Sequence, residues 1–151
     1  AKKQTALDTE AQMKKNYVVS LEEQNLGWWQ NEIARMNKLK TGGEKEMYAR
    51  LLSYISLACY SYSNSAVSQN NAEVAKKILG IYKLADPDNA DRPYIEAILY
   101  AKLGDDARAV TLLQEAARLG FTDKAKMESE DAFSRIKSTN EFQSILNKIP
   151  S

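Results

Sequence analysis

Histidine is absent from this chain of 151 residues, and its absence removes the commonest catalytic and metal-binding side chain. The Ser-His and Cys-His pairs that activate nucleophiles cannot be assembled, and the usual histidine sites for zinc are excluded. Cysteine occurs once, at Cys59, so no internal disulfide can form and a reactive thiolate would lack an imidazole base. Because Cys59 lies in an apolar stretch, we predict that it is a small core residue.

Glycine and proline are also scarce, with six and three residues respectively. These residues interrupt helices, whereas the abundant Ala, Leu, Lys and Glu favour them, so the composition predicts helix throughout. No apolar run reaches the roughly 18 residues that a transmembrane helix needs. Gly42-Gly43 is followed by Glu44 rather than by Lys and Ser or Thr, which excludes a phosphate-binding loop there.

The charges are nearly balanced, with 21 Lys and Arg against 20 Asp and Glu and a net charge of +1. A protein that binds nucleic acid usually carries a basic face, and one that binds an anionic membrane carries a basic cluster. The balance predicts neither partner.

Two acidic segments are candidates for ligand sites. Residues 86–91 begin like a calcium loop, but the sixth position is not glycine and the twelfth is not glutamate. Glu128, Glu130 and Asp131 are interpreted as carboxylates near a helix start, where they complement the helix dipole. We therefore expect no metal, no cofactor and no catalytic residue, although paired carboxylates alone would suffice for a glycoside hydrolase.

Apolar residues recur at helical spacing along the first third of the chain. Residues 5–40 are predicted to be helical, with a break or bend at 25–27, and the pattern leaves open one kinked helix or two. Trp28 and Trp29 are adjacent and so point about 100° apart on a helix. We expect one of them in the core, and the other at the boundary or facing a partner.

Residues that favour turns divide the rest of the chain into further helices. A helix is predicted over 44–69, a second one ends before Pro87, and a further pair lies on either side of residues 103–106 and ends at Gly120. Beyond it, Ser129 is predicted to cap a short helix that bears Phe133 and Ile136. Asn140 is predicted to cap a last one, which bears Phe142, Ile145 and Leu146.

One spacing occurs twice. Tyr60, Ala75 and Leu79 recur 34 residues later as Tyr94, Ala109 and Leu113. A period of about 34 residues is typical of a helix-turn-helix unit that buries its apolar face by stacking on copies of itself. Small Ala97 and Ala109 are predicted to face each other where two helices approach closely.

The stretch from Tyr94 to Gly120 resembles a tetratricopeptide repeat, and residues 56–89 resemble a degenerate copy. The matching residues of the better copy are Ala97, Tyr100, Gly104, Ala109, Leu113 and Ala116. The resemblance implies an all-α, tetratricopeptide-like stack of about seven helices. The expected stack is a single domain, 1–151. It comprises an N-terminal helical segment (5–43), a degenerate unit (44–89), a repeat (90–120) and capping helices (121–151).

The same resemblance implies a function, because the first helix of each tetratricopeptide pair lines a concave groove. The expected partner is a protein or peptide, and the expected role is that of a non-catalytic scaffold. Few Lys, Arg or Asn line the groove, so a carboxylate clamp is not expected. The groove-facing residues would be Tyr60, Asn64, Ser68, Tyr94, Ile98 and Lys102. Alternatively, Tyr60 and Tyr94 merely pack in the interface between the two repeats.

Two alternatives stay open: a structural accessory domain of a larger cell-envelope protein, and a carboxylate-based hydrolase. The chain starts at Ala1 with a polar segment, which indicates either that a signal peptide was removed or that the chain was trimmed. Tetratricopeptide domains are also common in bacterial envelope proteins. We therefore expect an extracytoplasmic, periplasmic or envelope-anchored location, with a cytoplasmic one as the alternative.

Overall fold

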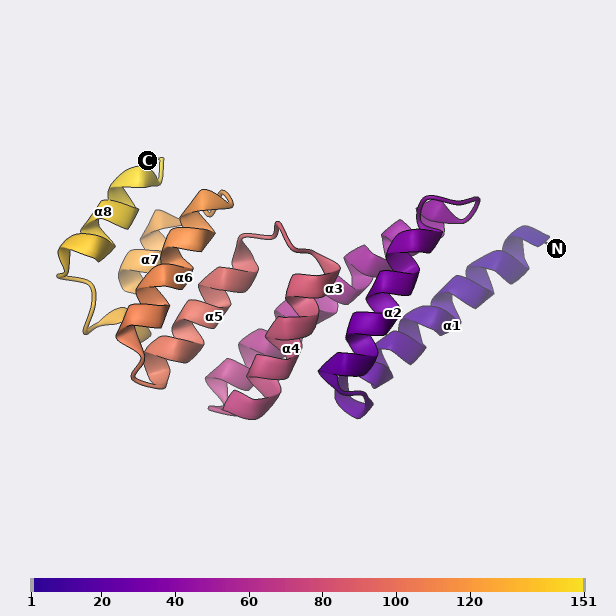
Figure 1. Cartoon of the computed structure of the whole chain (residues 1–151), viewed down its shortest axis with the longest axis horizontal. Coiled ribbons are helices and arrows are strands. Elements are labelled where there is room, and N and C mark those ends of the chain that lie inside the picture. The colour runs from indigo at the N-terminus through magenta and orange to yellow at the C-terminus, as the bar shows by residue number, and fades with distance from the viewer. Residues whose placement is uncertain (1, 151) are drawn as a thin grey trace. The chain divides into compact units, whose positions relative to one another are not determined.

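The computed structural model describes residues 2–150, with side chains from residue 7 onward. This part of the chain is helical and contains no strand, which confirms the all-α prediction. None of the described helices is both long enough and apolar enough to cross a bilayer. Figure 1 shows the elements, which are α1 (Lys2–Glu23), α2 (Leu26–Leu39), α3 (Lys45–Ser68), α4 (Ala72–Ala85), α5 (Asp91–Lys102), α6 (Asp106–Arg118), α7 (Lys124–Ser129), the 3-10 helix η1 (Asp131–Phe133) and α8 (Asn140–Lys148).

The chain divides into two compact units. The first unit comprises Ala1–Ser63 and Lys76–Pro87, and the second comprises Asn64–Ala75 and Asp88–Ser151. The division passes through α3 and α4, so each of these helices contributes to both units. We describe each unit separately.

In the first unit, α1 and α2 are two separate helices that run antiparallel (Figure 1). The break lies at Asn25, whose backbone is extended and whose side chain accepts a hydrogen bond from the Trp28 amide at 2.8 Å. An asparagine at this position satisfies a donor that the helix start would otherwise leave unpaired. The predicted break at 25–27 is confirmed, and the two-helix alternative is the correct one.

Polar contacts join the helices of the first unit. The Arg50 guanidinium on α3 donates to both carboxylate oxygens of Glu10 on α1, at 2.6–3.2 Å. The Lys77 ammonium on α4 donates to the carbonyl oxygens of Glu22 and Gln24, at 3.0 and 3.3 Å. A cation at those carbonyls complements the negative end of the α1 dipole.

Helix ends follow the predicted turn residues. Asn70 has φ +59, a left-handed conformation that asparagine tolerates better than most residues and that stops α3. Gly104 and Gly120 have φ +85 and +104 and follow α5 and α6. After each glycine the next amide bonds back to a carbonyl of the preceding helix, from Asp105 to Tyr100 and from Phe121 to Ala116. This is the usual glycine termination of a helix.

The core of the second unit lies between α5 and α6, which run antiparallel (Figure 1). Ala97 and Ala109 are both 0% exposed, which confirms their predicted burial. Their counterparts 34 residues earlier, Ser63 and Ala75, are also 0% exposed. Leu79 and Leu113, which are related by the same spacing, are both buried.

The C-terminal segment packs on that same core, through side chains that are all buried: Met127, Phe133, Ile136, Phe142, Ile145, Leu146 and Ile149. Two predicted caps need correction. Ser129 ends α7, and the 3-10 helix that follows is capped instead by Glu130, whose side chain accepts from the Ala132 amide. The cap of α8 is Thr139, which accepts from the Phe142 amide, because its backbone is extended while Asn140 is already helical.

Candidate functional site

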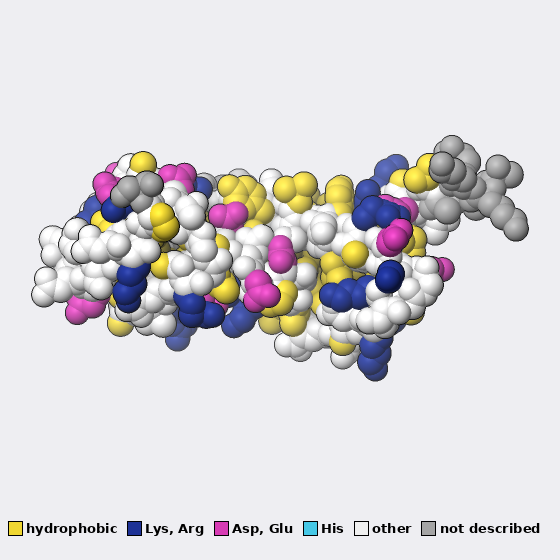
Figure 2. All heavy atoms as spheres, turned by 90° about the horizontal axis from the view of Figure 1, so that it is seen from above, with side chains coloured by type: hydrophobic (Ala, Val, Ile, Leu, Met, Phe, Trp, Pro, Cys, Tyr) yellow, Lys and Arg dark blue, Asp and Glu magenta, His cyan; other side chains and the backbone are white. Residues whose placement is uncertain are grey.

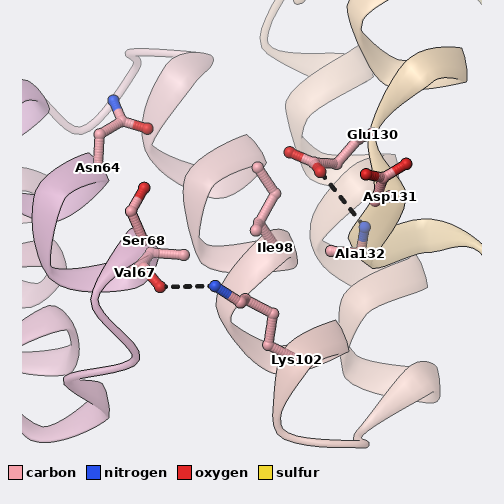
Figure 3. A pocket seen from close by; sticks show the side chains of 8 residues that line it. All are labelled: Asn64, Val67, Ser68, Ile98, Lys102, Glu130, Asp131 and Ala132. Carbon is pink, nitrogen blue, oxygen red and sulfur yellow. Dashed lines mark hydrogen bonds between the residues drawn. The ribbon is translucent and has the colours of Figure 1, made fainter.

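The second unit contains a pocket of about 440 Å³. Three segments form its walls: the last turn of α3, one face of α5, and the start of η1 (Figure 3). The volume lies within the roughly 300–1,000 Å³ of ordinary ligand pockets. The lining side chains are Asn64, Val67, Ser68, Ile98, Lys102, Glu130, Asp131 and Ala132.

The end of α3 supplies a polar wall. Asn64 and Ser68 are one helical turn apart, so they share a face, and both point into the pocket (Figure 3). Val67 is buried, while Ser68 is exposed. The amide and the hydroxyl can each donate and accept hydrogen bonds.

Helix α5 supplies the floor. Ile98 is half-buried against the core of the second unit, and Lys102 lies one turn later on the same face. The Lys102 ammonium donates to the carbonyl oxygen of Val67 at 2.8 Å. That carbonyl belongs to the last turn of α3, at the negative end of the helix dipole, which favours a cation. The lysine therefore joins α3 to α5 along one side of the pocket.

Glu130 and Asp131 supply an acidic wall opposite α3 (Figure 3). The backbone is extended at Glu130, with φ −74 and ψ 116, between the end of α7 and the start of η1. One oxygen of Glu130 accepts from the Ala132 amide at 3.3 Å, which fixes that side chain at the rim. Asp131 is exposed.

The buried ring of Tyr94 packs against Phe133, which follows this wall in the chain. Burial raises the pKa of its phenol, and the nearby charges of Glu130 and Asp123 raise it further. The hydroxyl is therefore neutral at every physiological pH, and it can act only through hydrogen bonding and packing.

The structure brings together four of the residues that the sequence predicted for a groove: Asn64, Ser68, Ile98 and Lys102 all line the pocket. Tyr94 does not, and its prediction as a groove residue is wrong. Its ring is 1% exposed and packs on Phe121 and Phe133, which come from later parts of the chain.

Tyr60, the other predicted aromatic groove residue, lies on the part of α3 that belongs to the first unit, where it is half-buried.

The sequence analysis did not predict the acidic wall as part of a site. The sequence interpretation puts Glu130 and Asp131, together with Glu128, near a helix start. Glu130 caps η1 and Asp131 begins it, but Glu128 lies in the last turn of α7, so the interpretation is wrong for that residue. The second role of Glu130 and Asp131 depends on the turn between α7 and η1, which no periodic pattern reveals.

Two more hollows lie among the described residues of the first unit. One, of about 430 Å³, contains the exposed Leu57 and Tyr54, and its charged residues Lys14 and Arg50 both pair with Glu10. Because both cations already pair with Glu10, this hollow offers a ligand mainly apolar contact.

The other hollow, of about 270 Å³, contains Trp28, Tyr17 and Glu32. The Tyr17 hydroxyl donates to Glu32, which also accepts from Arg35. Trp29 is buried in the core and Trp28 is half-buried, as the sequence predicted for adjacent tryptophans.

Charges of both signs are interspersed over the face shown in Figure 2, without a continuous patch of either sign. In the part of the chain that the structure describes, no group of three or more carboxylate or thiol ligands converges. The pocket of the second unit therefore stands out for its combination of groups: an apolar floor, a hydroxyl and amide wall, and a carboxylate wall. This arrangement can hold a ligand that has both an apolar and a polar part.

No family model, curated protein or solved structure matches this chain. The chemistry of the pocket is therefore the basis for inferring a function.

Proposed function

We propose that this protein is a non-catalytic helical scaffold that binds a peptide segment of another protein in the pocket of the second unit. One observation carries the proposal. Separate segments of the chain place apolar and hydrogen-bonding side chains around a single open pocket, and these include four residues predicted from the repeat pattern. A peptide presents that mixture, with apolar side chains between backbone donors and acceptors.

The chemistry of the pocket favours binding over catalysis. Ser68 is its one hydroxyl among the described lining residues, and the chain has no histidine to activate it. The polar groups therefore act as hydrogen-bond partners. The resemblance of the sequence to tetratricopeptide repeats supports this proposal, because by that resemblance α3 and α5 would be the first helices of their pairs, the ones that hold the ligand in that family.

Selection from a random peptide library displayed on phage, with the full chain as bait, tests the proposal. Ser68→Trp places an indole at the pocket wall, and Ser65→Trp is the matched control. Ser65 is an exposed serine on the same turn of α3 that does not line the pocket. We expect enriched peptides to bind the wild type and Ser65→Trp equally and to lose affinity for Ser68→Trp.

Enriched peptides that bind all three proteins alike would place the binding surface elsewhere. A library that yields no binder at all would favour the alternative of a structural accessory domain. The proposed extracytoplasmic location needs its own test, namely fractionation of the source cell followed by detection with an antibody against the full chain.

A further inference from the structure

The acidic wall of the pocket consists of the neighbouring carboxylates of Glu130 and Asp131. Among the residues that the structure describes, no ion pair joins Glu130 or Asp131 to a lysine or arginine. Two neighbouring carboxylates at one rim repel each other, and a cation placed between them would be attracted by both.

Three basic residues of the second unit have other partners. In Figure 3 the Lys102 ammonium points toward the end of α3, where it bonds to Val67, and away from the carboxylates. Lys126 lies over the face of the Tyr94 ring, with its ammonium 5.3 Å from the ring centroid. Arg135 pairs with Asp106 at 2.7 Å and also donates to the Ala101 carbonyl.

From this arrangement we infer that the pocket accepts a lysine or arginine side chain of the bound peptide, with its charged head at Glu130 and Asp131 and its aliphatic stem over Ile98. This inference rests on the proposed function and adds the chemical class of residue that the peptide must carry. Three features of the pocket match such a side chain: the apolar floor, the carboxylates at one rim, and the volume of about 440 Å³. Long basic side chains commonly bury their methylene groups in this way while the head meets polar partners.

The carboxylates also set the selectivity against other peptides. An acidic side chain would meet like charges at the rim, which disfavours it. A neutral side chain of the same length would keep the contact with Ile98 but lose the charge-assisted hydrogen bonds, which are the strongest ones available here.

The test begins with the peptides enriched from the library, each synthesised in two forms. In the second form, every arginine is replaced by citrulline, its neutral isostere, and every lysine by norleucine. Titration calorimetry with the full chain measures both affinities. We expect the charged form to bind between about tenfold and a hundredfold more tightly, the range that a charge-assisted hydrogen bond gives.

Two double variants locate this difference. Glu130→Gln with Asp131→Asn removes the acidic wall, and the glutamine amide oxygen can still accept from the Ala132 amide. Glu128→Gln with Glu141→Gln removes two exposed carboxylates outside the pocket and controls for the change in net charge. We expect the first pair to abolish the preference for the charged peptide and the second pair to retain it, with both proteins melting as cooperatively as the wild type.

The outcomes separate the two proposals. Peptides that bind at the pocket, as Ser68→Trp shows, but have no basic residue or lose nothing on neutralisation would overturn the inference and leave the proposed function standing. A charge preference that is equal in both double variants would also overturn it. A failure to select any peptide would remove the proposed function itself, and this inference with it.

Discussion

The phenol ring of Tyr94 is stacked on the ring of Phe121, with centroids 4.3 Å apart and ring planes 10° from parallel. Phe133 meets the same tyrosine edge-on at 5.8 Å. Tyr94 stands at the start of α5, whereas its two partners follow α6 and α7. The cluster thus packs the C-terminal segment against α5, and it buries the tyrosine ring that the repeat pattern assigned to a groove.

Removing this ring tests its placement. Tyr94→Ala should destabilise the protein by about 3–5 kcal/mol, as expected for the loss of a buried aromatic side chain. Tyr94→Phe keeps the ring and loses only a long hydrogen bond of 3.4 Å to the Lys126 carbonyl, and so should change stability by less than about 1 kcal/mol. Urea unfolding followed by circular dichroism measures both. A loss near zero for the alanine variant would mean that the ring is exposed after all.

Substitution of Ala109 tests how closely α5 and α6 pack. It is 0% exposed, so Ala109→Leu must force extra methyl groups into a packed interface and should destabilise the protein by about 1–3 kcal/mol. Ala107→Leu is the matched control, because Ala107 is exposed on the same helix and its change should stay within about 0.5 kcal/mol. Thermal melts that are equal for the two variants would contradict the packing described.

Glu10 makes stability depend on pH. Its hydrogen bonds and ion pair with Arg50 hold the pKa of this carboxyl below its usual value in the folded state, against the opposing effect of burial. The unfolded chain therefore takes up the proton first as the pH falls, and the stabilisation is full at neutral pH and lost through the acidic range.

We expect the wild type to be more stable than Glu10→Gln at pH 7. The difference should shrink as the pH falls below about 4.3, the ordinary glutamate value. Denaturant titrations of both proteins at several pH values measure it. A difference that stays constant down to the lowest pH would show that the Glu10 charge does not contribute.

The thiol of Cys59 should be unreactive in the native protein. It is 0% exposed, and burial raises the pKa of its thiol to about 12, so both access and thiolate are lacking. With Ellman's reagent at pH 8, we expect no fast reaction in buffer and one equivalent of released thiolate in concentrated urea. Rapid labelling of the folded protein would place this residue at the surface.

Local stereochemistry explains which parts of the fold could be predicted. Asn70, Gly104 and Gly120 end their helices by adopting a left-handed backbone. Asn25 begins α2 through its side-chain hydrogen bond, so the sequence sufficed to locate these turns. Helix α7 could not be predicted in this way, because it has six residues and one buried side chain, Met127, which is too short for a periodic pattern.

The site was only partly predictable, for a different reason. Asn64, Ser68, Ile98 and Lys102 lie on regular helices, so their faces follow from spacing. The environment of Tyr94 depends on Phe121 and Phe133, and the wall at Glu130 and Asp131 depends on how an irregular turn packs back against α5. Such contacts between distant segments leave no signal in one sequence read alone.

The core of the second unit has a consequence for how the protein folds. The cluster of buried side chains around α5 and α6 runs from Tyr94 to Ile149, on helices joined by short turns. Few long loops must close before these side chains meet, and a low contact order of this kind is associated with folding in microseconds to milliseconds. We therefore expect the segment from α5 onward to acquire its core early, without waiting for a pairing with the distant N-terminal helices.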